Sequence, residues 1–265
     1  MTKLQIGLIV SAIALLVVMY FGCDTKPEEQ IALEKSRALA AESTNLDALL
    51  LAAKEKIGPA QAAEIAILEQ QVEAATDDVA KTDALKQLSG KWYEYRQPAV
   101  AGAYAQQVAE LENTEDAWSI AGTTYAICIQ MSEEQKVREF CTNRAIAAFE
   151  SAISINPDNV AHRVNLALTY AENPPEDDPM RGPTMLLELN QSHPDNVLIL
   201  NSLARLAIKT GQYDRALARL EQSYAQESQN VNTICMLAQV HNALGNGEAA
   251  AGFAQQCEAA RNQQD

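Results

Sequence analysis

The feature that most constrains this chain is a pattern that recurs every 34 residues near its C-terminal end. Four pairs of equivalent residues lie 34 positions apart: Leu203 and Leu237, Ala204 and Ala238, Gly211 and Gly245, and Ala216 and Ala250. A period of this length predicts one supersecondary unit per copy, and each unit has an apolar face that only a neighbouring copy can bury. The chain is therefore expected to form a stack of similar units.

Earlier segments carry the same order of large and small residues. WSIAGTTY (118–125) and VNLALTY (164–170) each place a small residue shortly before a tyrosine. The segments that follow them carry small or apolar residues and then a proline: Ala145, Phe149, Ala152 and Pro157 in one copy, and Gly182, Leu186, Leu189 and Pro194 in the next. A poorer copy precedes them, with Leu85, Leu88, Ser89, Trp92 and Tyr104. This order resembles the tetratricopeptide repeat, over about Glu115 to Gln264.

The resemblance implies an all-α fold, a right-handed solenoid of stacked helix pairs. The composition favours helices that pack closely, because alanine is abundant and aromatic residues make up only 5% of the chain. Small residues should let the two helices of each pair approach each other: Gly122, Ala167, Ala204 and Ala238. Larger residues should fill the spaces between pairs: Trp118, Tyr125, Phe149, Tyr170 and Leu220.

The chain is expected to divide into repeats and a helical cap. We place a degenerate repeat at 82–114, a repeat with 11 extra residues at 115–159, a repeat with three extra residues at 160–196, and regular repeats at 197–230 and 231–264. The 11 extra residues should lengthen each helix of their pair by about a turn and a half. Residues 45–81 should form helices that cap the stack, because apolar residues recur there at helical spacing. These helices could also associate with a second copy of the chain.

The N-terminus predicts attachment to a membrane. Residues 4–22 are almost wholly apolar and would span about 28 Å as a helix, enough to cross a bilayer. Lys3 precedes this run and mostly acidic residues follow it, so the body of the protein should face the periplasm or the exterior of a bacterial cell. A glycine followed by Cys23 resembles a bacterial lipoprotein signal. Residues 1–23 are therefore either a retained anchor or a signal that leaves a lipid on Cys23, followed by a polar stalk over 24–44.

The other four of the five cysteines have places in the expected repeats. Cys128 and Cys141 should flank the tip of the long helix pair. Cys235 and Cys257 should lie where the ends of two antiparallel helices meet. Thiols outside the cytoplasm tend to pair, so two disulfides are predicted. The alternative is that all four are small buried core residues.

Several function classes are excluded by charge and by missing motifs. The formal net charge of -15 opposes binding to nucleic acid. His162, His193 and His241 fall in three different repeats without metal-ligand spacing, and the sequence has no phosphate-binding loop or nucleophile motif. We therefore expect no enzyme activity, no metal and no cofactor.

A groove for a protein partner is the remaining candidate site. In tetratricopeptide-like stacks the exposed sides of the first helices line a groove that takes an extended peptide or a helix. By register these positions are Ser119, Thr123, Val164, Leu168, Asn201, Arg205, Gln239 and Asn242. The resemblance thus implies a membrane-tethered adaptor or scaffold of the bacterial envelope. Two alternatives remain: a homo-oligomeric structural spacer, and an assembly factor similar in layout to those of cytochrome c maturation.

Overall fold

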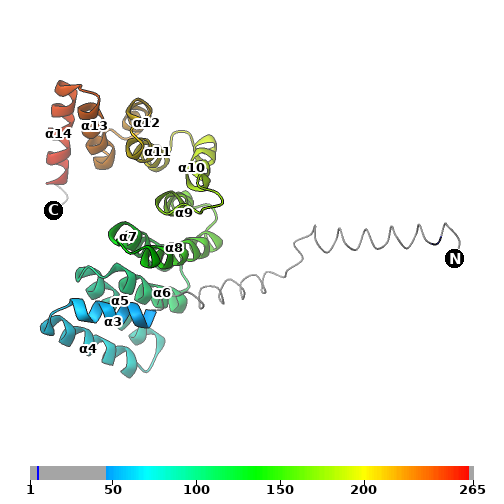
Figure 1. The fold of residues 1–265 in the computed structure, drawn as a ribbon, viewed down its shortest axis with the longest axis vertical. Coiled ribbons are helices and arrows are strands. Elements are labelled where there is room, and N and C mark those ends of the chain that lie inside the picture. Colours follow the sequence, from blue (N-terminus) through cyan, green and yellow to red (C-terminus); the bar gives the residue numbers. More distant parts are fainter. Residues whose placement is uncertain (1–4, 6–45, 263–265) are drawn as a thin grey trace. The chain divides into compact units, whose positions relative to one another are not determined.

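The computed structural model describes residues 5 and 46–262, and within 46–262 every regular element is an α-helix (Figure 1). The helices follow one another as α3 (Leu46–Lys56), α4 (Pro59–Ala74), α5 (Asp78–Glu94), α6 (Pro98–Glu112), α7 (Glu115–Met131), α8 (Gln135–Ile155), α9 (Val160–Glu172), α10 (Arg181–Ser192), α11 (Val197–Lys209), α12 (Tyr213–Gln226), α13 (Val231–Ala243) and α14 (Gly247–Arg261). The predicted all-α class is confirmed.

The predicted anchor and stalk fall outside the part of the chain that is described. Residues 1–45 are a separate unit of the chain, and helices α3 to α14 all belong to the unit that begins at Leu46. The prediction that Cys23 carries a lipid and the prediction of a stalk over 24–44 therefore lie outside the described residues. None of the described helices has the length and apolar character that a membrane crossing requires.

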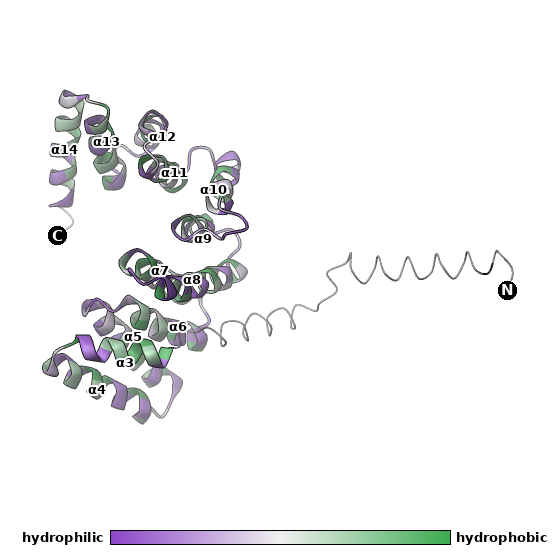
Figure 2. Cartoon of the chain, viewed as in Figure 1, coloured by the Kyte–Doolittle hydropathy of each residue, from purple (hydrophilic) through white to green (hydrophobic). Residues whose placement is uncertain are grey.

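The helices pack as hairpins that stack in chain order. The pairs are α5 with α6, α7 with α8, α9 with α10, α11 with α12, and α13 with α14, and each pair also packs on the next. Helices α3 and α4 cover the first pair, with α3 on α6 and α4 on α5. Buried residues form a series of clusters along the stack, and each helix carries both apolar and polar residues (Figure 2). This arrangement is a tetratricopeptide-like helical repeat.

The first helix of every pair begins at a side-chain cap. The capping oxygens belong to Asp77, Thr114, Asn159, Asn196 and Asn230, and each accepts a hydrogen bond from a backbone N–H in the first turn. Such caps satisfy N–H groups that have no partner inside the helix. The turns that lead into the second helices of the last two pairs contain Gly211 and Gly245, whose φ angles are +73° and +79°. Glycine recurs there because other residues rarely adopt this left-handed conformation.

Small residues bring the helices of a pair close together. A Cβ atom added to Gly122 would lie 2.7 Å from the ring of Phe149, so α7 and α8 can approach this closely only with glycine at that position. Ala167 and Ala204 are fully buried at the equivalent positions. Ala238 is only half-buried, and it lies in the last pair, which no further pair covers within the described residues.

The long pair, α7 and α8, contains all of the extra residues in its helices. Helix α7 has 17 residues where α11 has 13, and α8 has 21 where α12 has 14. The extension is therefore about one turn in α7 and two turns in α8, rather than equal on both sides. All of the extra residues lie in the helices because the turn between them, residues 132–134, stays as short as the turn at 210–212.

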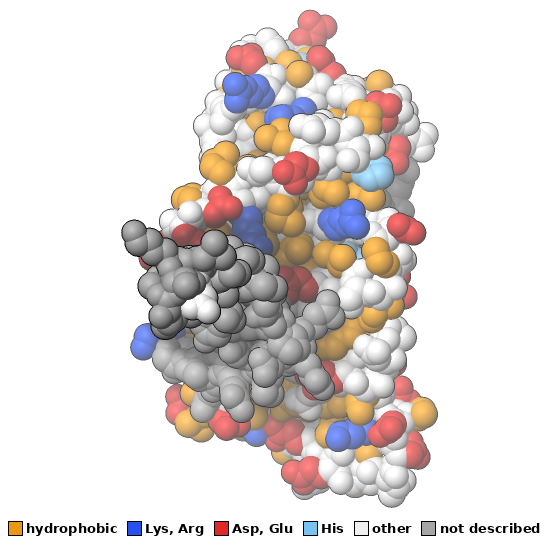
Figure 3. Space-filling view, turned by 90° about the vertical axis from the view of Figure 1, so that its right-hand side faces the viewer, with side chains coloured by type: hydrophobic (Ala, Val, Ile, Leu, Met, Phe, Trp, Pro, Cys, Tyr) orange, Lys and Arg blue, Asp and Glu red, His pale blue; other side chains and the backbone are white. Residues whose placement is uncertain are grey.

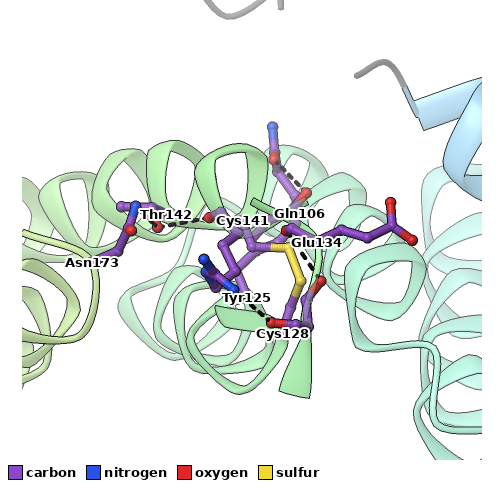
Figure 4. Close-up of a disulfide and its surroundings, with 9 residues drawn as sticks. Gln106, Tyr125, Cys128, Glu134, Cys141, Thr142 and Asn173 are labelled. Carbon is purple, nitrogen blue, oxygen red and sulfur yellow. Dashed lines mark hydrogen bonds between the residues drawn. A yellow bond between two sulfur atoms is a disulfide. The ribbon is translucent and has the colours of Figure 1, made fainter. Parts of the chain in front are cut away.

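Two disulfides join the helices of individual pairs, and they are the two pairings that the sequence predicts. Cys128 of α7 is bonded to Cys141 of α8 near the tip of the long pair, and both residues are buried (Figure 4). Cys235 of α13 is bonded to Cys257 of α14, with 5.0 Å between their Cα atoms. Each bridge closes a loop within one hairpin, which corresponds to roughly 3 kcal/mol of stabilisation.

A half-buried carboxylate ties α7 to the start of the next pair. Glu115, in the first turn of α7, accepts hydrogen bonds from Asn156 Nδ2 at 2.6 Å, from Asn159 Nδ2 and from His162 Nε2 at 2.8 Å. The hydrogen bond from Asn159 lowers the pKa of Glu115 most, followed by those from Asn156 and His162. His162 is 3% exposed, so its place is structural.

Replacing Gly182 with alanine should destabilise the fold. The added Cβ would lie 2.4 Å from the Ala167 carbonyl oxygen and 2.6 Å from the Ala171 nitrogen, and these backbone atoms of α9 cannot move aside cheaply. We expect a loss of about 1–3 kcal/mol in the free energy of unfolding, measured by urea denaturation. The matched control is Gly252→Ala, which meets open space and should stabilise α14 by up to about 1 kcal/mol. A Gly182→Ala protein as stable as the control would contradict the tight approach of α9 and α10.

Replacing Glu115 with glutamine should remove a part of the pH dependence of stability. A carboxylate whose pKa is lowered on folding from its ordinary value of 4.5 stabilises the fold above that pH, and the contribution is lost as the pH falls through the lower, folded-state pKa. Glu115→Gln should therefore be less stable than the parent at neutral pH, and the difference should shrink below about pH 4.5. Urea unfolding at several pH values measures it, with the exposed Glu221→Gln as control. A difference that stays constant with pH would show that the contact is not ionic.

Candidate partner-binding groove

The first helices of successive pairs line one face of the stack. In Figure 1 helices α7, α9 and α11 lie on the inner side of the curve formed by residues 46–262, and their second helices lie outside them. Three hollows open along these helices. The first, of about 630 Å³, lies between α5, α6 and α7; the second, of about 160 Å³, lies between α7 and α9; and the third, of about 610 Å³, lies between α9, α11 and α13.

The three hollows share lining residues and so form one continuous groove. Thr123 and Ile127 of α7 line both the first and the second hollow. Asn165, Leu168 and Arg205 line both the second and the third. We call the whole surface the groove and refer to its parts as the first, second and third hollows.

Six of the eight residues predicted to line the groove do so. Ser119 lies in the first hollow and Thr123 in the first and second. Leu168 and Arg205 lie in the second and third hollows, and Asn201 and Gln239 in the third. Asn242 is exposed but lines none of the three.

The prediction for Val164 is wrong. Its side chain is fully buried, in a cluster with Leu186, Ile199 and Leu203. The physical reason is that α11 packs directly on α9 and covers this part of its surface. Val164 therefore belongs to the core between two repeats and is not available to a partner.

Asn201 lines the third hollow but its amide is already satisfied inside the protein. Its Nδ2 donates to Thr233 Oγ1 at 2.9 Å, and its Oδ1 accepts a hydrogen bond from Ser223 Oγ, also at 2.9 Å. These contacts join α11, α12 and α13, and Asn201 is only 9% exposed. Since a buried polar network of this kind fixes how the helices fit together, we assign Asn201 to positioning of the last two repeats.

Arg205 is the cation at the centre of the groove. It is exposed, it lies where the second and third hollows meet, and it forms no ion pair or hydrogen bond with any described residue. Lys209, one turn later on α11, is instead paired with Glu172 at 2.8 Å. A free guanidinium in a groove can donate two parallel hydrogen bonds to a carboxylate.

The sequence prediction missed most of the first hollow. Tyr93 of α5 is 50% exposed and Ile120 of α7 is 61% exposed, and both line this hollow together with Ala105 and Val108 of α6. The degenerate copy in 82–114 aligns Ser89 with Gly122, so Lys86 and Gly90 of α5 correspond to Ser119 and Thr123, but the predicted groove residues begin at Ser119 and include none on α5. Ile120 offered a signal, because it is a large apolar residue between Ser119 and Thr123 on the expected groove side.

The visible part of the face opposite the groove carries side chains of several kinds. Figure 3 shows the side on which α10 lies in Figure 1, and charged and hydrophobic side chains are interspersed there. The described residues contain no group of three or more His, Cys, Asp or Glu side chains that could hold a metal ion. His241, one of the three histidines, stacks on Phe253 with 5.5 Å between the ring centres.

Comparison with known proteins finds solved structures that resemble this chain. No family model and no curated protein matches the sequence. A thermophilic TPR protein from Thermus thermophilus is 18% identical, with 69% of this chain and 90% of that chain covered and a TM-score of 0.49. PilW, described as a type IV pilus biogenesis factor, is 17% identical, with 68% and 78% covered and a TM-score of 0.45.

MamA from Desulfovibrio magneticus RS-1 is 13% identical, with 72% of this chain and 99% of that chain covered and a TM-score of 0.42. Identities and scores this low carry no functional conclusion for this chain. The assignment of a tetratricopeptide-like helical repeat follows from its own stacked hairpins and its 34-residue period.

Proposed function

We propose that this chain is a protein-interaction scaffold or adaptor whose groove binds a peptide or helix of a partner protein. The observation that carries the proposal is the groove itself, which runs along the first helices from α5 to α13. It exposes large apolar side chains at Tyr93 and Ile120, and it holds the cation of Arg205, which has no ion-pair partner among the described residues. Exposed apolar anchors beside a charge are features with which a groove binds a protein segment, because a partner removes the apolar surface from water and pairs with the charge.

We propose a binding role for the groove and not a catalytic one. Of the three histidines, His162 is buried against Glu115 and His241 is stacked on a ring, so neither faces a nucleophile or a bound ion among the described residues. The groove residues that remain free are mostly apolar, hydroxyl or amide side chains. They suit recognition of a peptide backbone and side chains.

The proposal includes attachment to a membrane through the N-terminus, with the repeats outside the cytoplasm of a bacterial cell. It is supported by the apolar run over 4–22, by Lys3 before it, and by two disulfides in the repeats, which form in oxidising compartments. The mass of the intact purified chain distinguishes the two tethers. A lipid on Cys23 with residues 1–22 removed indicates a lipoprotein, and a full-length chain indicates an anchor.

Photo-crosslinking from the groove tests the binding function. A photoreactive phenylalanine analogue is placed at Thr123 or Gln239, both of which line the groove, in the full chain in its native membranes. We expect both positions to crosslink one partner through the same short segment, identified by mass spectrometry. The control position is Leu187 on α10, which is 43% exposed outside the groove and should not crosslink that segment.

Two results would contradict the proposal. Equal crosslinking of the segment from Leu187 would show that the groove has no special role. Crosslinks only between copies of this chain would favour the homo-oligomeric spacer instead.

A further inference from the structure

The first hollow differs from the rest of the groove because its two walls stand apart. Neighbouring first helices pack directly at α7 with α9, at α9 with α11 and at α11 with α13, but α5 and α7 make no comparable contact. Helix α6 packs on both of them and forms the floor between them. The result is a trough of about 630 Å³ with a helix on each side and one beneath.

The surface of this trough is apolar and has been left open by small residues. Tyr93 of α5 and Ile120 of α7 project from the two walls, and Ala105 and Val108 of α6 lie on the floor. Gly90 lies in the interior of α5, has ordinary negative φ, and a Cβ added to it would meet nothing within 4 Å. Neither backbone conformation nor close packing therefore requires glycine at this position.

A glycine inside a helix costs up to about 1 kcal/mol relative to alanine, so Gly90 weakens α5 without any return to the fold. What it does provide is space, since any side chain at position 90 would project into the trough. Because this space lies within the trough, it is available to a bound molecule.

One end of the trough carries negative charge. Lys86 of α5 and Glu112 of α6 form an ion pair at 2.6 Å and neutralise each other. Asp116 of α7 is exposed in the same hollow and forms no ion pair with any described residue. Its position in the first turn of α7 also favours that helix, but the charge remains available to a ligand. The net charge of -15 adds attraction for a cationic partner at longer range.

We infer that the trough between α5 and α7 binds a basic amphipathic helix of the partner protein. The apolar face of that helix lies on Tyr93, Ile120 and the floor of α6, with one large side chain over Gly90, and a lysine or arginine at its edge pairs with Asp116. A helix suits the site because two helical walls and a helical floor leave the fourth position of a helix bundle empty. The inference rests on the proposed function and adds to it the place and chemistry of the bound segment.

Binding of designed peptides to the full chain tests the inference. The chain is held in nanodiscs of neutral phosphatidylcholine, and empty nanodiscs serve as the blank. Three probes of about 18 residues, or five helical turns, are compared: an amphipathic leucine–lysine helix, the same composition scrambled, and an amphipathic leucine–glutamate helix. We expect the leucine–lysine helix to bind roughly tenfold more tightly than either of the others, by fluorescence anisotropy.

A large side chain at position 90 should abolish the preference for the leucine–lysine helix and stabilise the protein. Gly90→Leu should weaken binding of the leucine–lysine helix by roughly tenfold, because the leucine side chain occupies the space in the trough. It should also raise the melting temperature of the protein, because leucine favours the helical conformation of α5 more than glycine does. The matched control is Gly252→Leu on α14, which also meets open space and should raise the melting temperature without changing binding. Asp116→Asn should weaken binding of the leucine–lysine helix and leave binding of the scrambled peptide unchanged.

Unchanged binding of the leucine–lysine helix to Gly90→Leu would overturn the inference. Equal binding of the scrambled peptide would also overturn it, because general attraction to an acidic surface would then explain the binding. The crosslink from Gln239 is measured in the same variants. If the partner segment is still captured there while Gly90→Leu leaves binding unchanged, the groove retains its proposed function and only the assignment of the trough fails. Loss of all capture from the unmodified chain would instead count against the proposed function.

Discussion

The close approach of paired helices at small residues is the interaction on which the rest of the structure depends. At Gly122 the ring of Phe149 occupies the space that a side chain would need, and at Gly182 the backbone of α9 does so. Because the helices of each pair are held this near, the apolar side chains on their other faces remain uncovered until the next pair packs on them. Burial is therefore shared between neighbours along the stack, and no single central core forms among residues 46–262.

The groove is a consequence of the same packing. When second helices take the outer side, first helices are left with one face that no other described element covers. How open that face becomes depends on the distance between successive first helices. Direct contact between α9 and α11 buries Val164, whereas the separation of α5 and α7 leaves the hollow above α6. The polar network around Asn201 and the contacts of Glu115 then hold neighbouring pairs in fixed positions.

The sequence predicts the repeated features well because they depend on local chemistry. Gly211 and Gly245 mark left-handed turns that few other residues can adopt, and the positions of the four cysteines within hairpins follow from the helix boundaries. The register also predicts most of the groove. It could not predict that Val164 is covered, because that depends on how far one pair rotates against the next. It could not predict the first hollow, because the spacing of α5 and α7 is a property of three helices together.

The most direct test of the close packing is the magnetic resonance signal of the Gly122 α-protons. The account predicts nuclear Overhauser contacts between these protons and the ring protons of Phe149, together with chemical shifts displaced by the ring current, since a Cβ at this glycine would lie 2.7 Å from the ring. The same signals are expected between Gly102 of α6 and Tyr125 of α7, where one pair packs on the next and the corresponding distance is also 2.7 Å. Ordinary shifts and no contacts at both glycines would contradict the account, because neither the helices within a pair nor the successive pairs would then approach closely enough to form the stack and its groove.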